Sequence, residues 1–209
     1  MDGSISVSQH QYAVTPGFRG LLLAAGQGSR FAGGGTDNKL LASLPGSEVS
    51  LVEHAARSML AALPVMAVVN SLHNEVAQRL AALGCELALC QHAAEGMSAS
   101  LMCGVAQTQD AAGWIVALGD MPFVQTSTHA GLLAALRDGI DIAVPSYQGR
   151  RGNPVAFSWR HRAALLQLRG DTGARALLQT FPVQQIPVND RGIHRDIDTH
   201  DDLIEYTKD

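Results

Sequence analysis

Short apolar runs alternate along the chain with segments whose apolar residues repeat at helical spacing. Five runs cover residues 21–25, 65–69, 85–90, 114–118 and 141–145, and a sixth strand pattern covers residues 183–188. Runs of this length are typical of buried strands rather than of helices. Helical spacing predicts helices over residues 51–63, 73–83, 126–136 and 174–181, another that begins within 95–101, and a short terminal helix after Thr199.

Strands that alternate with helices indicate the α/β class. We expect a single domain with a doubly wound, mostly parallel sheet and right-handed crossovers, a Rossmann-like arrangement. Ser50 followed by Glu53 predicts a capping box at the start of the first helix. Ligands of such sheets bind beyond the carboxyl ends of the strands, so the glycine-rich loop after Ala25 lies at an expected binding site.

The composition narrows the possible functions. With 209 residues, 46% of them hydrophobic, the chain fits one domain over residues 19–209, and the polar residues 1–18 are expected to be a disordered lead-in. A net charge of −4 argues against a nucleic-acid partner. No apolar run reaches the roughly 20 residues of a membrane span and no signal peptide is indicated, so we expect a cytoplasmic enzyme or binding domain. The three cysteines, Cys85, Cys90 and Cys103, have apolar neighbours and are expected to be buried, reduced thiols.

The glycine-rich loop carries the first candidate site. Glycines such as Gly26 and Gly28 let backbone N–H groups face an anion without a Cβ in the way. Arg30 and Lys39 add the positive charge that a triphosphate needs. The loop lacks the Gly-Lys-Ser/Thr of a Walker A motif, and Phe31 stands where the dinucleotide fingerprint needs its third glycine. The alternative is a flexible loop with two solvated basic side chains, and we favour phosphate binding.

Two acidic segments are candidates for holding a metal ion. Asp120 follows the apolar run 114–118 and precedes a Met-Pro pair, a position that a plain turn explains poorly. Mg²⁺ near a phosphate site prefers one or two carboxylates together with phosphate oxygens and water. Near the end of the chain, Asp196 and Asp198 flank Ile197, which places both carboxylates on one side of an extended segment. An N-cap or turn at Asp120 and an ordinary acidic tail are the alternatives.

The glycine loop resembles the signature of the MobA-like NTP transferases, in which a strand leads into a loop with one arginine and one lysine. Here the signature covers residues 23–30, Leu-Ala-Ala-Gly-Gln-Gly-Ser-Arg, and ends at Lys39. Residues 33–38 expand the loop beyond the usual length in the family. The resemblance implies a nucleotidyltransferase with a GT-A-like fold. It also implies nucleotide contacts from Ala24, Ala25, Gly26 and Gly28, and catalytic contacts to the triphosphate from Arg30 and Lys39.

Further motifs of the same family extend the resemblance to about residue 203. A G-M-x-x-S-L turn lines the nucleotide pocket in the cytidylyl branch, and it is matched here by Gly96, Met97, Ser100 and Leu101. The local alternative is a helix N-terminus capped by Ser98.

Both acidic segments also match motifs of the family. The stretch Gly-Asp-Met-Pro resembles the metal-aspartate motif, and D-I-D-T-x-x-D-L resembles the second acidic motif. The resemblance implies that Asp120 and Asp198 hold Mg²⁺ together, with Asp196 as the second choice for the partner ligand.

Two motifs resemble the molybdenum cofactor cytidylyltransferases in particular. An R-G-H-P-V-x-F stretch is matched at Gly152, with Asn153 in place of the histidine, although the arginines there are equally explained as solvated surface. A G-D-x-G-A-R motif is matched at Asp171 and Arg175. Read locally, Asp171 or Thr172 caps the helix that follows. With the resemblance we favour a second anion at this place, such as the phosphate of an acceptor.

The resemblance therefore implies transfer of CMP from CTP to a phosphorylated acceptor, with molybdopterin as the expected acceptor and Mg²⁺ as the cofactor. Ala25 supports cytidylyl transfer, since guanylyl-transferring members carry Leu-Ala-Gly-Gly at this point. The alternatives are a molybdenum cofactor guanylyltransferase and a sugar- or alditol-phosphate cytidylyltransferase. A different class is a non-catalytic nucleotide-binding maturation factor for a molybdenum hydroxylase, and such a hydroxylase or its chaperone is a possible protein partner. Two acidic motifs favour an enzyme, because a binding module needs only one of them.

Overall fold

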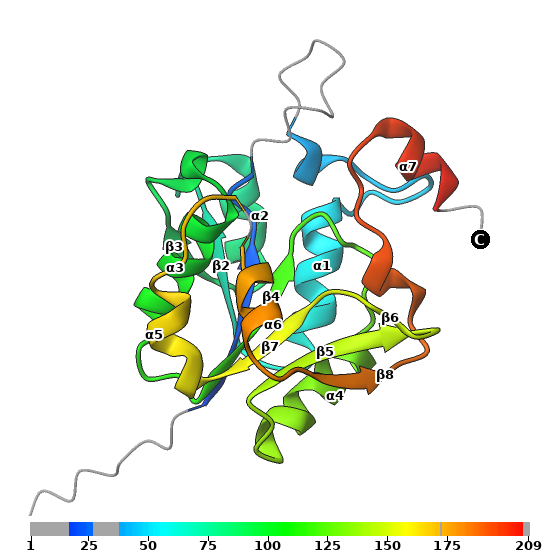
Figure 1. The fold of residues 1–209 in the computed structure, drawn as a ribbon. Helices are drawn as coiled ribbons and strands as arrows, with labels where there is room; N and C mark the ends of the chain where they lie inside the picture. Colours follow the sequence, from blue (N-terminus) through cyan, green and yellow to red (C-terminus); the bar gives the residue numbers. More distant parts are fainter. Residues whose placement is uncertain (1–16, 27–37, 172, 207–209) are drawn as a thin grey trace, which may run out of the picture.

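The computed structural model describes residues 17–26, 38–171 and 173–206. An eight-stranded sheet runs through this part of the chain in the order β3-β2-β1-β4-β7-β5-β6, with β8 paired to β5 (Figure 1). The strands are β1 (Phe18–Leu23), β2 (Val65–Val69), β3 (Glu86–Leu89), β4 (Gly113–Leu118), β5 (Ile142–Tyr147), β6 (Arg150–Arg151), β7 (Val155–Ser158) and β8 (Gln184–Pro187). The predicted α/β class with a mostly parallel sheet is confirmed.

The first four long strands form the parallel half of the sheet. β1 pairs in parallel with both β2 and β4, and β2 pairs in parallel with β3. All four therefore end at the same edge of the sheet. Residues 24–26, which follow β1, and the acidic turn after β4 lie at this edge, which is where a ligand of such a sheet binds.

The second half of the sheet is mixed, which the apolar pattern did not predict. β7 runs antiparallel to both β4 and β5 and lies between them. The local cause is a hairpin between β5 and β6, in which Gln148 (φ 51°) and Gly149 (φ 78°) take left-handed conformations. A two-residue turn with positive φ at both positions matches the twist of antiparallel strands and reverses the chain.

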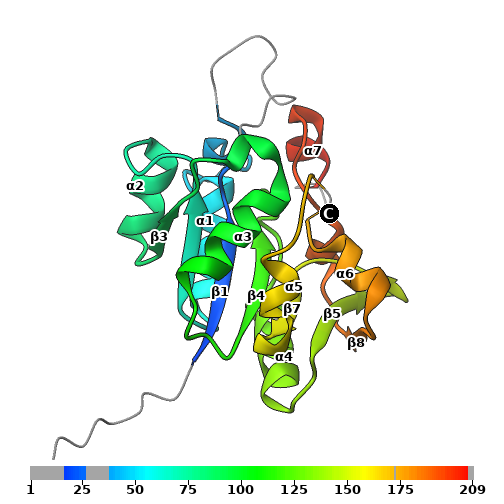
Figure 2. The same cartoon turned by 60° about the vertical axis from the view of Figure 1, so that its left-hand side comes forward.

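Helices cover both faces of the sheet, as the two views together show (Figures 1 and 2). They are α1 (Leu51–Leu60), α2 (Glu75–Ala82), α3 (Met97–Gln107), α4 (Thr126–Arg137), α5 (Arg162–Leu165), α6 (Arg175–Thr180) and α7 (His200–Glu205). Short 3-10 helices cover Lys39–Leu41, Ala93–Glu95, Trp159–His161 and Arg191–His194.

Alternation along the strands separates the interior into two cores. In β1, Leu21 packs on one face with residues of α3, α5 and α6, while Leu22 packs on the other with α1, α2 and α4. Both leucines are fully buried. Successive side chains of a strand point to opposite faces, so a run that is apolar throughout requires helices on both sides.

The predicted elements agree with the structure apart from their ends. The strand over residues 65–69 has the predicted bounds, and the helix predicted over residues 73–83 begins at Glu75 with Asn74 as its N-cap. β1 begins at Phe18, inside the segment expected to be a lead-in, whose residues 1–16 lie outside the described part. None of the described helices has the length and apolar content that a membrane span requires.

The cysteines are largely as expected. Cys85 and Cys90 are buried and unpaired, and Cys103 is unpaired but only partly buried. Burial raises the pKa of the Cys85 thiol to about 11, so this side chain stays protonated and unreactive at neutral pH.

Candidate active site

A buried lysine joins the two acidic segments. Lys39 Nζ lies 2.9 Å from Asp120 Oδ2 and 2.8 Å from Asp198 Oδ1. We call these three residues the Asp–Lys–Asp cluster. Lys39 is only 8% exposed, so water has little access to it. The two carboxylates compensate its charge. The structure therefore places the carboxylates of Asp120 and Asp198 on one ammonium group.

Backbone hydrogen bonds place the two carboxylates. Asp120 lies just beyond β4, where Gly119 N–H donates to the carbonyl of Leu23 at 3.0 Å and ties the turn to the end of β1. The Ile197 N–H donates to the Asp120 carbonyl at 2.9 Å, and the Ile197 side chain is fully buried. The residue after this anchor is Asp198, so its carboxylate is held beside Asp120.

The lysine is placed by a short helix that rests on α1. Asn38 caps the 3-10 helix Lys39–Leu41 by accepting from the Leu40 N–H, and Leu51 N–H donates to the Ala42 carbonyl at 2.8 Å. The N-terminus of α1 therefore supports the segment that carries Lys39.

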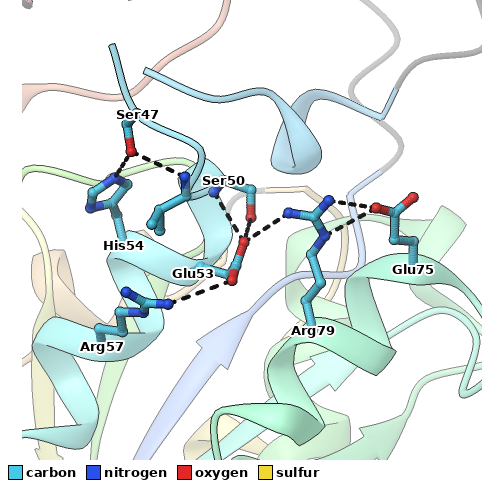
Figure 3. A network of polar contacts seen from close by, with 8 residues as sticks. Ser47, Ser50, Glu53, His54, Arg57, Glu75 and Arg79 are labelled. Atoms are coloured by element: carbon cyan, nitrogen blue, oxygen red, sulfur yellow. Dashed lines mark hydrogen bonds and ion pairs between the residues drawn. The ribbon is translucent and has the colours of Figure 1, made fainter. Parts of the chain in front are cut away.

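A polar network stabilises that N-terminus (Figure 3). The Ser50 N–H and hydroxyl both donate to the Glu53 carboxylate, at 3.0 and 2.7 Å, which confirms the predicted capping box. Arg79 of α2 donates to the same carboxylate at 2.9 Å and also pairs with Glu75. Burial opposes ionisation of Glu53, but the hydrogen bonds from Ser50 and Arg79 outweigh it and lower its pKa to about 2.

The charges of the cluster affect the pKa values of Lys39 and of the neighbouring Asp196. Burial disfavours the ammonium of Lys39, yet the charges and hydrogen bonds of Asp120 and Asp198 outweigh burial and raise its pKa. Burial raises the pKa of Asp196, and the nearby charges of Asp198 and Asp120 add to this effect. Lys39 therefore stays charged at neutral pH.

The donor set fits a hard divalent cation. Asp120 Oδ1 is buried and has no hydrogen-bond partner among the described residues, although Oδ2 is held by Lys39. An unpaired buried carboxylate oxygen is costly unless a cation or donor meets it. The described residues hold no group of three or more metal-binding side chains, so phosphate oxygens and water would complete the coordination of Mg²⁺.

A pocket of about 230 Å³ opens beside the cluster. It is bounded by the ends of β1 and β4 and by the first turn of α3. Among the residues expected to bind nucleotide, those that line it are Ala25, Gly26, Gly96, Met97, Ser100 and Asp171, together with Lys39 and Asp120. Asn70, which follows β2, donates from its side chain to the Ala25 carbonyl at 3.1 Å and fixes this wall. Its position at the carboxyl end of a strand was the only signal for it in the sequence.

Other expected residues lie elsewhere. Ala24 and Leu101 are buried in the two cores and are not among the residues that line the pocket. Gly28 and Arg30 lie outside the described residues. Arg175 is the exposed first residue of α6. It does not line this pocket, and it does not line the second pocket described below, which contains Gly152.

The start of α3 is capped by a distant segment. Asp171 Oδ1 accepts from the Met97 N–H at 3.0 Å, and the Gly170 carbonyl accepts from the Ser98 N–H at 3.3 Å. The local alternatives for Ser98 and Asp171 therefore do not hold, and Thr172 lies outside the described residues. Ser98 is buried and donates its hydroxyl to the Arg169 carbonyl instead of capping the helix, and α6 has Ala174 at its N-cap with no side-chain hydrogen bond. Ser98 does not cap α3, and Asp171 caps α3 rather than α6, because tertiary packing brings the 169–171 loop onto α3.

Gly152 and Asn153 line a second pocket of about 220 Å³, which also includes Asp196. Leu118, two residues before Asp120, lines both pockets.

Known proteins share sequence features and the fold with this chain. Residues 20–187 match the family described as MobA-like NTP transferase domain. Nicotine blue oxidoreductase of Paenarthrobacter nicotinovorans is 31% identical over 196 residues, which are 88% of this chain and 93% of the relative. The crystal structure of Rv0371c from Mycobacterium tuberculosis H37Rv in complex with manganese is 24% identical, with a TM-score of 0.73 over 92% of this chain and 98% of the other. A nucleotidyl transferase from Methanothermobacter thermautotroptrophicus is 20% identical, with a TM-score of 0.76 over 91% and 96%.

Proposed function

Because the chain belongs to the MobA-like NTP transferase family, we propose that it transfers CMP from CTP to the phosphate of molybdopterin and releases pyrophosphate. The observation that carries this proposal is the Asp–Lys–Asp cluster at the rim of a pocket formed by the strand ends. Such a transfer requires charge neutralisation and in-line alignment, and it requires little covalent chemistry from the protein.

In this reaction an oxygen of the acceptor phosphate forms a bond to the α-phosphorus, and the bond from that phosphorus to pyrophosphate breaks. Lys39 leaves the two carboxylates and neutralises the triphosphate. We propose that Arg30 also neutralises the triphosphate. Asp120 and Asp198 would hold Mg²⁺, which neutralises phosphate oxygens when bound. The first turn of α3 and Ala25 would face the base and ribose.

Two features support cytidine. Ala25 lines the pocket, where a glycine would leave more room for a purine. The Gly-Met-x-x-Ser-Leu turn also places Met97 and Ser100 on the pocket wall.

The Mn²⁺-bound structure of Rv0371c supports a divalent metal in this fold.

The test is pyrophosphate release from each of the four NTPs with Mg²⁺, with and without molybdopterin, and with D120N as the inactive control. We expect release with CTP only when molybdopterin is present. Release with GTP would assign the protein to guanylyl transfer, and release with a sugar or alditol phosphate in place of molybdopterin would assign that acceptor. CTP binding without release under any condition would indicate a maturation factor.

The name of the 31% identical relative supports a second candidate, reduction of nicotine blue. Such a reduction needs an electron donor such as a reduced nicotinamide dinucleotide, whose fingerprint loop is absent from residues 23–30. We expect no loss of the colour of nicotine blue in the presence of NADH or NADPH, and bleaching would favour this second candidate.

A further inference from the structure

The second pocket, which we call the hairpin pocket, shares Leu118 with the first pocket, which we call the nucleotide pocket. Leu118 and Met121, on either side of Asp120 in sequence, both line it. Its polar wall consists of Arg150, Arg151, Asn153, His194 and Asp196. A group bound there would therefore lie beside the 118–121 turn, which carries Asp120.

The frame of the hairpin pocket is fixed by long-range hydrogen bonds. The Asn153 N–H donates to the Ile193 carbonyl at 3.0 Å, and the His194 ring lies 3.2 Å from the Arg150 carbonyl. A Cβ on Gly152 would stand 2.3 Å from the Ile193 carbonyl oxygen, so only glycine permits this approach. The two arginines are thus presented by a hairpin that is pinned to the 191–194 segment.

The charges of the two arginines are not compensated. Both side chains are exposed, and none of the acidic residues in the described part of the chain forms an ion pair with either guanidinium. Both arginines line the pocket, and guanidinium groups are suited to neutralising the oxygens of a phosphate dianion. Solvated arginines at a hairpin end are common, but these two line a pocket whose wall includes Leu118 and Met121, on either side of Asp120 in sequence.

We propose that the hairpin pocket binds the acceptor as a phosphomonoester, with Arg150 and Arg151 neutralising its phosphate. This inference rests on the proposed nucleotidyl transfer. The carboxylate of Asp196 faces the same pocket, where it repels an anion and accepts from N–H or O–H groups. The acceptor is therefore oriented with its phosphate toward the arginines and hydrogen-bond donors of its remaining body toward Asp196.

The chemistry of the transfer agrees with this arrangement. A phosphomonoester has a second pKa near 6, so it is largely a dianion at neutral pH. Two guanidinium groups favour the dianion further. Its oxygen attacks the α-phosphorus without losing a proton, pyrophosphate leaves with the bonding electrons, and no general base is needed.

The first test separates acceptor affinity from nucleotide affinity. We expect R150Q/R151Q to raise the KM for molybdopterin at least tenfold while the KM for CTP stays within twofold of wild type. R137Q is the matched control, because Arg137 is an exposed residue at the end of α4, far from the strand ends. An unchanged KM for molybdopterin in R150Q/R151Q would overturn the proposal.

The second test needs no turnover. Phenyl phosphate, a simple aromatic phosphomonoester, is titrated into the protein by calorimetry without nucleotide. We expect a Kd at least tenfold weaker in R150Q/R151Q and within twofold of wild type in R137Q and K39A. If K39A loses the affinity and R150Q/R151Q keeps it, phosphate binds in the nucleotide pocket and the proposal is wrong. If the wild-type protein transfers no nucleotide to any acceptor, the proposed function fails, and the phenyl phosphate titration alone then decides whether the hairpin pocket binds phosphomonoesters.

Discussion

Asp120 and Asp198 share the ammonium of Lys39, which lies within 3 Å of both carboxylates. Two carboxylates that contact the same ammonium group lie close enough to repel each other unless a cation lies between them. Without nucleotide the lysine serves as that cation. If Asp120 and Asp198 held Mg²⁺, Lys39 would be free to contact the triphosphate.

Removal of Lys39 should therefore reduce catalysis far more than folding. We expect K39A to lower turnover by about 10²–10³-fold, because it removes charge that stabilises the transition state. The circular dichroism spectrum should stay that of wild type. Turnover within a few-fold of wild type would show that Lys39 is an ordinary loop residue.

The same variant should bind metal differently. In K39A the two carboxylates face each other without a cation, so we expect Mg²⁺ to raise its melting temperature by more than it raises that of wild type. Thermal unfolding in EDTA and in millimolar Mg²⁺ measures this difference. Equal shifts in both proteins would indicate that Lys39 and the metal do not compete for the carboxylates.

The two aspartates should behave as one unit. We expect D120N and D198N each to lower turnover strongly, and the double variant to be little worse than either single variant. D110N is the control, because Asp110 is exposed at the opposite edge of the sheet, before β4. Additive losses in the double variant would mean that the carboxylates act independently.

Nucleotide choice should be visible without an acceptor. We expect CTP with Mg²⁺ to raise the melting temperature more than GTP does, since a ligand stabilises the folded state in proportion to its preferential affinity for it. Dye-based thermal unfolding at equal nucleotide concentrations measures the difference. A larger shift with GTP would contradict the cytidylyl assignment.

The start of α3 offers a test that distinguishes conformation from contact. Gly96 has φ of 114°, and a Cβ there would lie 3.0 Å from the Asp171 carboxylate and the Gly170 carbonyl. We expect G96A to reduce the stabilisation by CTP, because it displaces the 169–171 loop from the pocket wall. Gly139, with φ of 88° and no atom near its Cβ position, supplies the control G139A, which carries backbone strain alone. Equal effects of the two substitutions on CTP binding would refute this explanation.

Glu53 predicts how stability depends on pH. Its folded pKa of about 2 lies below the ordinary value of 4.5, so the carboxylate stabilises the fold above pH 4.5 and loses this contribution as the pH falls toward 2. We expect E53Q to cost about 1–2 kcal/mol at pH 7, reduced from the full shift because water screens Arg79, which is 34% exposed. Urea unfolding should show the gap between wild type and E53Q closing between pH 5 and pH 2.5. E48Q, at an exposed glutamate, should show no such gap.

Local sequence patterns determined the elements and the edge at which the site lies. The apolar run 65–69 became a buried strand with the same bounds, because an unbroken apolar run is stable only between two layers of helices. Ser50 and Glu53 formed their capping box, since both partners lie within one helical turn. The position of Asp120 beyond β4 also follows from the pattern.

Tertiary structure alone decided which distant groups meet. Nothing in the local spacing of Asp198 indicates its partner, which the family resemblance supplied. The fold brings the two together through the hydrogen bond from Ile197 to the Asp120 carbonyl. Likewise Asp171 caps α3 rather than the helix beside it, and Arg150 and Arg151 line a pocket because the hairpin is pinned to residues 191–194. Periodicity reports which face of an element is buried, whereas contacts between distant segments depend on how whole layers pack, and a single local pattern carries no information about that packing.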